Sequence, residues 1–139
     1  MFLVHIRMAI LAMALVATAA DLHAQGVVVI GHANLRKLDA NTVMRIYMGR
    51  VIEVDGIPVT AINASSGSDL RVRFLRSFLN QDEEKYIAYW TVRRYIGKGA
   101  PPREITKSAD LIRFVTTTPG AIGYVDAADV QPGLNVLLR

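Results

Sequence analysis

Short apolar runs alternate with segments of helical periodicity along most of the chain. A continuous β-branched run that ends at a glycine, as Val27–Ile30 does before Gly31, predicts a strand buried on both faces. Three other runs lie next to turn residues and also predict strands. The four predicted strands are Val27–Ile30, Pro58–Ile62, Ala121–Val125 and Val136–Leu138.

Four helical segments separate these runs. Asp39 is a good N-cap for the first, which carries an apolar stripe to Tyr47 and ends at Gly49. The second begins near Ser66 or Ser68 and buries Leu70, Phe74, Leu75, Phe78 and Leu79.

The other two helical segments follow in the second half of the chain. The third starts at the acidic triplet Asp82–Glu84, where the helix dipole favours negative charge, and carries Ile87, Trp90 and Tyr95. Pro101 and Pro102 prevent its continuation. Ser108 is the predicted cap of the fourth, which holds Leu111, Ile112 and Val115. Strands that alternate with helices predict an α/β domain in which helices cover a mixed sheet.

The first 24 residues have the pattern of a secretory signal peptide. Met8–Ala17 is an apolar run preceded by a short, weakly positive stretch and followed by small residues. The run is short for a bilayer span, which needs about 20 apolar residues. An uncleaved anchor or a buried first helix is the alternative. Cleavage after Ala20 or after Ala24 would release an exported, periplasmic protein whose domain, residues 25–139, has no membrane span.

Composition narrows the function classes. The 139 residues include 52% hydrophobic residues and no cysteine, which excludes a disordered chain, a disulfide framework, a thiolate zinc site and a cysteine nucleophile. The net charge of +4 favours anions in general. No dense Lys/Arg block marks a nucleic-acid surface.

The strand-to-helix junction Ile62–Asp69 is the best candidate for chemistry. A helix that starts directly after a buried strand exposes free N–H groups and the positive end of its dipole. Gly67 lets a ligand approach the backbone, and the neighbouring hydroxyls of Ser65, Ser66 and Ser68 add donors. These groups could form a cradle for a small oxyanion.

The same residues also fit a plainly capped helix. Ser66 with Asp69 three residues later is a capping box, which satisfies the N–H groups from within the chain. Asp69 also places a carboxylate in the first turn, where it repels an incoming anion. Both interpretations stay open.

No other residues combine into an enzyme site. Single histidines such as His32 lack a second ligand, and the chain has neither a Gly-x-Ser-x-Gly elbow nor a Ser-x-x-Lys motif. Arg71, Arg73 and Arg76 could form a basic patch for a phosphate or an acidic partner, but a solvated face is the simpler interpretation. We therefore expect neither catalysis nor a metal or cofactor.

Four segments together resemble the phosphate-binding protein of bacterial ABC phosphate importers, and in particular small single-lobe relatives of it. They are Met44–Arg50, the loop Gly67-Ser68 with Arg71 and Phe74, Trp90–Pro102, and Thr118–Val125. The last segment is the most specific. The resemblance covers most of the chain from Val27 to about Val125.

The resemblance implies a periplasmic-binding-protein lobe in which a mixed sheet is flanked by helices. In full-length relatives two lobes close on phosphate and deliver it to a membrane permease, and one lobe supplies an arginine, a serine and glycine-rich N–H groups at a helix start. Here Gly67 and Ser68 keep that pattern. The arginine position falls on Ala64, and the following Gly-Thr becomes Asp69-Leu70. With the hydroxyls of the loop and Arg71, which could reach around the helix start, the candidate ligand groups are Ser65, Ser66, Gly67, Ser68 and Arg71.

Two functions follow from these patterns. The first is a solute-binding domain, associated with an ABC permease, that binds phosphate or a similar oxyanion weakly. The second is an envelope interaction or scaffold protein whose ligand loop is degenerate, as Ala64 and Asp69 suggest.

Overall fold

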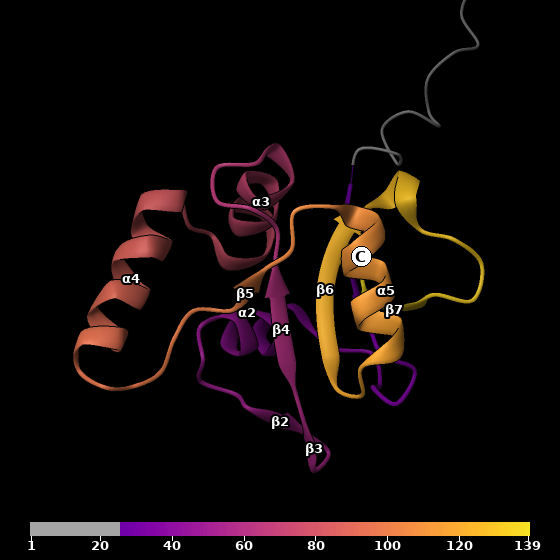
Figure 1. Cartoon of the computed structure of the whole chain (residues 1–139), viewed down its shortest axis with the longest axis horizontal. Helices are drawn as coiled ribbons and strands as arrows, with labels where there is room; N and C mark the ends of the chain where they lie inside the picture. Colours follow the sequence, from indigo (N-terminus) through magenta and orange to yellow (C-terminus); the bar gives the residue numbers. More distant parts are fainter. Residues whose placement is uncertain (1–25) are drawn as a thin grey trace, which may run out of the picture.

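The computed structural model describes residues 26–139; the predicted signal peptide lies outside the described residues. The described chain builds a five-stranded sheet of order β5-β4-β6-β1-β7 and a separate two-stranded hairpin (Figure 1). The sheet strands are β1 (Val27–Gly31), β4 (Thr60–Asn63), β5 (Arg103–Glu104), β6 (Ala121–Asp126) and β7 (Asn135–Leu138). The hairpin strands are β2 (Glu53–Val54) and β3 (Ile57–Pro58).

In the described part of the chain four α-helices accompany the sheet: α2 (Ala40–Tyr47), α3 (Asp69–Phe74), α4 (Glu83–Tyr95) and α5 (Ser108–Thr117). A π-helical turn, η1 (Leu75–Leu79), continues α3, and a 3-10 turn, η2 (Ala127–Asp129), follows β6. Within residues 26–139 none of the helices has the length and apolar character needed to cross a bilayer.

The sheet is mixed, which confirms the predicted α/β class. β4 runs parallel to β5 and β6, whereas β1 runs antiparallel to β6 and β7. The predicted strand Pro58–Ile62 is in fact divided. Pro58 belongs to the hairpin, and β4 begins at Thr60. Proline has no N–H to donate to a ladder, so it is excluded from a central strand.

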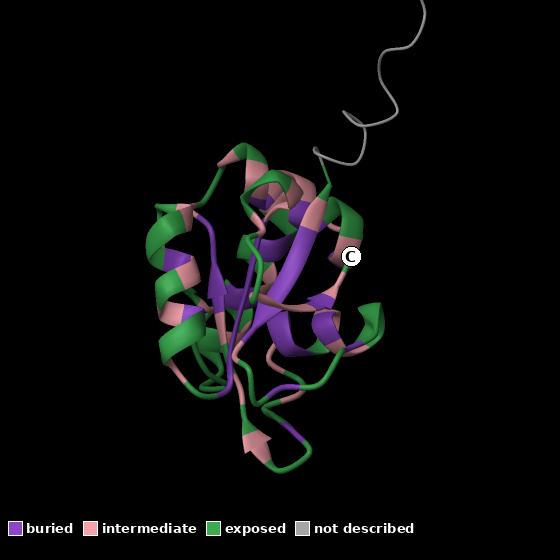
Figure 2. Ribbon diagram, turned by 90° about the vertical axis from the view of Figure 1, so that its right-hand side faces the viewer, coloured by how far each residue is buried: buried purple, intermediate pink, exposed green. Residues whose placement is uncertain are grey.

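Successive residues of β1 point to opposite faces of the sheet and so enter two separate cores. Val29 packs with residues of α2, α3, η1 and α4 on one face. Val28 and Ile30 pack with Leu111 and Val115 of α5 on the other. Figure 2 shows the buried residues concentrated in the strands between these helical layers.

The predicted cap Asp39 is confirmed and the predicted cap Ser108 is not, whereas Asp82, which was predicted only as a helix-start charge, also serves as a cap. Asp39 caps α2 by accepting from the Thr42 N–H at 2.7 Å, and Asp82 caps α4 by accepting from the Lys85 N–H at 2.8 Å. Ser108 was predicted to cap α5, but Lys107 is the N-cap and makes no side-chain cap hydrogen bond. The chain enters α5 directly from the extended Lys107, so Ser108 is already helical.

α4 does not use the apolar stripe that its sequence suggests. Trp90 is buried, but Ile87 is 47% exposed and Tyr95 is 91% exposed. Hydrogen bonds to the end of α2 determine which face of α4 packs against the rest of the protein. Tyr86 and Trp90 donate to the Tyr47 carbonyl at 3.1 and 3.2 Å, and Ile87 and Tyr95 lie off that face.

A buried polar network fixes the carboxyl end of β4. The fully buried Asn63 accepts from the Tyr124 hydroxyl at 2.9 Å and donates to the Tyr86 hydroxyl at 3.0 Å. Tyr124 in turn accepts from the Ala64 N–H at 2.9 Å, and its ring stacks on Phe74 at 3.8 Å between centroids. The network therefore holds the backbone where the loop after β4 begins.

Replacing Tyr124 by phenylalanine tests this network. Tyr124→Phe keeps the stacked ring but leaves the buried Ala64 N–H and the Asn63 Oδ1 each without this partner. We expect the free energy of unfolding to fall by about 1–3 kcal/mol, measured by urea denaturation. The matched control is Tyr95→Phe at an exposed position, where a change below about 0.5 kcal/mol is expected. Equal effects of the two substitutions would contradict a structural role for the Tyr124 hydroxyl.

Candidate functional site

The candidate site lies at the point where the helical connections that follow neighbouring strands pass to opposite faces of the sheet. The chain leaves β4 through α3 and α4 on one face and leaves β5 through α5 on the other. Because β4 and β5 are parallel neighbours, their carboxyl ends open at the same edge. A crevice at such a switch point is where open α/β sheets bind ligands. In Figure 1 this edge lies beyond the arrowhead of β4, next to α3.

The loop from Ala64 to Ser68 turns the chain from β4 into α3. Gly67 has a φ of +75°, a backbone conformation that glycine adopts without strain. Ser68 is the N-cap of α3, and its hydroxyl accepts from the Arg71 N–H at 3.3 Å. The Ser65 hydroxyl points elsewhere and donates to the Thr106 hydroxyl at 3.0 Å.

The predicted capping box between Ser66 and Asp69 is wrong. Ser66 lies two residues before the N-cap, so its hydroxyl is too early in the chain to cap α3. Asp69 turns instead to Arg73, one helical turn later, at 2.8 Å. The N–H groups of Ser66 and Gly67 instead donate to carboxylates from outside the loop, while the Ser68 N–H donates to the Ser65 carbonyl at 3.0 Å.

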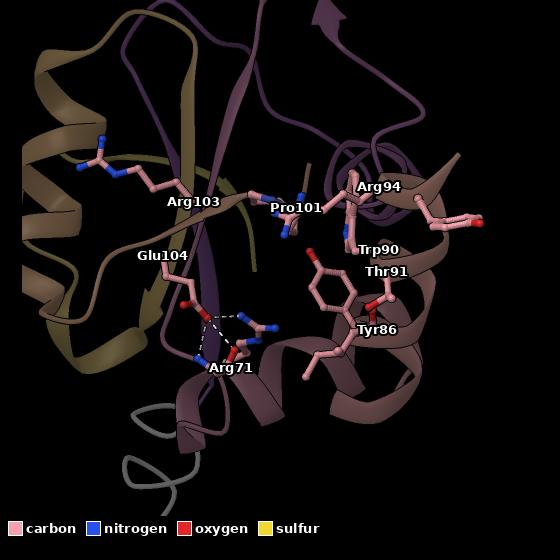
Figure 3. Close-up of a pocket in the computed structure, with 12 residues that line it drawn as sticks. Arg71, Tyr86, Trp90, Thr91, Arg94, Pro101, Arg103 and Glu104 are labelled. Atoms are coloured by element: carbon pink, nitrogen blue, oxygen red, sulfur yellow. Dashed lines mark hydrogen bonds and ion pairs between the residues drawn. The ribbon is translucent and has the colours of Figure 1, made fainter. Parts of the chain in front are cut away.

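One carboxylate oxygen of Glu104 accepts three donors at the loop. The Ser66 N–H donates to Glu104 Oε1 at 2.8 Å, and the Ser66 hydroxyl donates to the same atom at 2.7 Å. The third donor is Arg71 Nη1, also at 2.8 Å. Figure 3 shows these contacts converging on Glu104. The three donors form a cradle for a negatively charged oxygen, and Glu104 supplies that oxygen.

Arg71 was predicted to lie on a solvated face with Arg73 and Arg76, and this is wrong because its side chain is buried. The residue is only 4% exposed, and its side chain folds back to the start of its own helix. Its Nε donates to Glu83 Oε2 at 3.0 Å, and its guanidinium carbon lies 5.2 Å from the centre of the Tyr86 ring. Of the other two arginines, Arg76 is exposed and Arg73 is half-buried beside Asp69 and Asp126.

The charges at the loop sum to a negative value. Arg71 contributes one positive charge, and Glu83 and Glu104 contribute two negative charges. Glu83 also accepts from the Gly67 N–H at 3.2 Å through its second oxygen. An external dianion would therefore meet both occupied donors and unfavourable charge.

Two pKa values near the loop are shifted in opposite directions, that of Glu104 by its contacts and that of Tyr86 by burial. Hydrogen bonds from Ser66, followed by the positive charge of Arg71, hold the pKa of Glu104 below its ordinary value. Burial raises the pKa of Tyr86. Both side chains therefore have their usual charge at physiological pH: Tyr86 is neutral, and Glu104 is a carboxylate that occupies the cradle.

A cleft of about 730 Å³ opens beside the cradle. It lies between α4 and the segment Pro101–Glu104, and the Ser66–Arg71–Glu104 contacts form one end (Figure 3). Its volume is within the range of about 300–1,000 Å³ that is usual for small-molecule sites. No cluster of three His, Cys, Asp or Glu side chains suited to a metal ion occurs in residues 26–139.

Of the predicted ligand residues, the structure brings Ser66, Gly67 and Arg71 together around two carboxylates, whereas Ser65 and Ser68 face other partners. Sequence reasoning missed Glu104 and explained Glu83 only as a helix-start charge. Glu104 is 33 residues from Arg71. No local spacing rule reaches that far, and only the pairing of β5 with β4 brings the two together.

Comparisons with solved structures find the same fold in phosphate transport proteins. An ABC-type phosphate transport receptor from Vibrio cholerae superposes with a TM-score of 0.56 at 11% identity, over 81% of this chain and 45% of that protein. A putative phosphate ABC transporter substrate-binding protein with bound phosphate, from Clostridium perfringens, gives a TM-score of 0.54 at 18% identity, over 81% and 44%.

The chain therefore spans less than half the length of these two proteins and has a fold like that of solute-binding proteins. No family model matches it, and no curated protein does. At 11% and 18% sequence identity, the likeness to these two proteins concerns the fold alone.

Replacing Glu104 by glutamine tests whether its charge stabilises the cradle. Because folding lowers the pKa of Glu104, its charge stabilises the protein above the ordinary carboxyl value of 4.5 and loses this effect as the pH falls through the lowered pKa. We expect Glu104→Gln to lower the free energy of unfolding at neutral pH by less than about 1 kcal/mol, since the carboxylate is half-exposed. The deficit should shrink in acid, as measured by urea denaturation across pH.

The matched control is Glu53→Gln in the hairpin, which removes an exposed carboxylate from another part of the molecule. It should leave the pH profile as in the wild type. A Glu104→Gln profile parallel to that of the wild type would show that the carboxylate is not held in the cradle.

Proposed function

We propose that this chain is a binding lobe of the solute-binding type that takes phosphate or a similar small oxyanion at the Ser65–Ser68 loop with Arg71. In the free protein Glu104 occupies the ligand position. The ligand binds by displacing this carboxylate, and binding is therefore weak. The partners implied by this proposal are an ABC permease or another envelope protein.

The observation that carries the proposal is the convergence of three donors on a single Glu104 oxygen. A backbone N–H, a hydroxyl and a guanidinium within 2.8 Å of one anionic oxygen is the arrangement used to bind oxyanions. A phosphate oxygen fits the same three donors because its size and charge are similar to those of a carboxylate oxygen. The likeness to two phosphate transport proteins supports the same ligand class.

An exposed apolar patch on α4 favours the second function, docking to another protein. Val92, Tyr95 and Ile96 are all more than half exposed at the carboxyl end of the helix. Aromatic and aliphatic side chains exposed side by side are typical of protein contact sites. On this alternative the filled cradle is a structural ion-pair cluster with no external ligand.

Phosphate titration of the wild type and of Glu104→Ala tests the first function. The substitution vacates the three donors and removes one negative charge, so the sum at the loop changes from −1 to zero. We expect the affinity for phosphate and for sulfate to rise by roughly tenfold or more, as for one charge-assisted hydrogen bond. The measurement is isothermal calorimetry at low salt, where charge screening is weak.

Glu53→Ala is the control because it removes an equal charge far from the loop. It should bind phosphate as the wild type does. If Glu104→Ala is folded and releases no heat with millimolar phosphate or sulfate, the cradle does not bind anions and the docking function remains.

Export is the second part of the proposal, and the processing of the full chain tests it. Expressed in a Gram-negative host, the chain should be recovered from the periplasm without its first 20 or 24 residues. Intact-mass spectrometry should then find an N-terminus at Asp21 or Gln25. A variant lacking Met8–Ala17 should stay in the cytoplasm. Recovery of the unprocessed chain from the membrane fraction would point to an uncleaved anchor.

A further inference from the structure

The cleft beside α4 has walls that suit a different ligand from a bare oxyanion. It is lined on α4 by the half-exposed Ile87 and by the edges of the mostly buried Tyr86 and Trp90, and also by Pro101 and Pro102. Figure 3 shows the α4 side chains facing the Pro101–Glu104 segment across the opening. Apolar and aromatic walls bind the flat, apolar part of a molecule, whereas a small hydrated ion gains nothing from them.

Three arginines line the cleft, and they differ in whether a carboxylate already neutralises their charge. Arg71 is paired with Glu83 and Glu104, at 3.0 and 2.8 Å. Arg103 turns away from the opening, and its guanidinium carbon lies 5.3 Å from the centre of the Phe114 ring (Figure 3). Arg94 lines the cleft, is exposed, and takes part in none of the ion pairs found within residues 26–139.

Arg94 therefore supplies the available positive charge of the cleft. A guanidinium offers several N–H donors in one plane and binds carboxylate or phosphate groups in pairs of hydrogen bonds. A ligand that contacts both kinds of wall combines an anionic group, which pairs with Arg94, and an apolar ring, which lies between Trp90 and Pro102.

We infer that this cleft is a binding site for a small organic anion that carries an aromatic or similarly flat apolar group. The anionic group pairs with Arg94 on α4. The apolar group lies between the aromatic side chains of α4 and the two prolines. The site is separate from the cradle, because its ligand pairs with Arg94 and does not need to displace Glu104.

Phenyl phosphate, inorganic phosphate and benzyl alcohol are suitable probes. Trp90 is the only tryptophan in the chain, so its fluorescence reports on the cleft directly. We expect phenyl phosphate to bind the wild type at least about tenfold more tightly than inorganic phosphate, which lacks the ring, or benzyl alcohol, which lacks the charge. Equal affinity for phenyl phosphate and either of the other probes overturns the inference, and so does the absence of binding at millimolar concentration.

Two substitutions locate the binding. Arg94→Gln should weaken phenyl phosphate binding by about tenfold or more, and the matched control Arg76→Gln, at an exposed arginine outside the cleft, should not change it. Thr91→Phe places a ring in the cleft from an exposed helical position and should compete with the ring of the probe. Unchanged affinity in both Arg94→Gln and Thr91→Phe overturns the inference.

The same titrations separate this inference from the cradle. The inorganic phosphate binding that Glu104→Ala gains over the wild type tests the cradle, because Arg94 is present in both proteins. The effect of Arg94→Gln on phenyl phosphate, measured with Glu104 intact, tests the cleft alone. Either site can therefore fail without affecting the result for the other.

Discussion

The burial of one guanidinium organises this end of the molecule. Arg71 is almost completely removed from water, and a buried charge is tolerated only when it is paired and hydrogen-bonded. Its two carboxylate partners come from different elements, Glu83 from the first turn of α4 and Glu104 from the end of β5. Compensation of a single charge thus ties α3, α4 and the edge of the sheet together, and the loop of the candidate site lies between them.

The same compensation limits what the loop can bind. A carboxylate held within the chain competes with any external anion at a high effective concentration, and it does so without losing translational freedom. If the cradle binds an oxyanion as proposed, this intramolecular ligand lowers its apparent affinity. The loop can therefore have donors in the right geometry for an anion and still bind it weakly, because Glu104 already occupies those donors.

The sequence predicts those features of the fold that depend on neighbouring residues. The β-branched run Val27–Ile30, the Asp39 cap, the acidic start of α4 and the strand at Ala121–Val125 all depend on spacings of a few residues, and each is found where expected. The mixed sheet follows from the alternation of strands and helices.

What the sequence does not predict depends on contacts between distant segments. The apolar spacing of α4 places Ile87 with Trp90, but hydrogen bonds to the Tyr47 carbonyl select a different face of the helix for docking. Glu104 escapes prediction for the same reason, since nothing near it in the sequence indicates that it will reach Ser66. The caps of α3 also differ, because a carboxylate from β5 satisfies an N–H group that a local capping box would otherwise satisfy.

Glu104 belongs both to the cradle and to the lining of the cleft, so the two proposed sites share one carboxylate. Its carboxylate fills the cradle and also lines the cleft, so an anion that displaces it from Ser66 moves a negative charge within the same crevice. Any displacement toward Arg94 would reduce the positive charge available to a second anion there. If both proposed sites bind anions, the shared Glu104 carboxylate would link them by a reciprocal free energy, and for two anions the linkage would be negative. A ligand in the cleft would therefore favour the filled state of the cradle, in which Glu104 stays on Ser66 and Arg71.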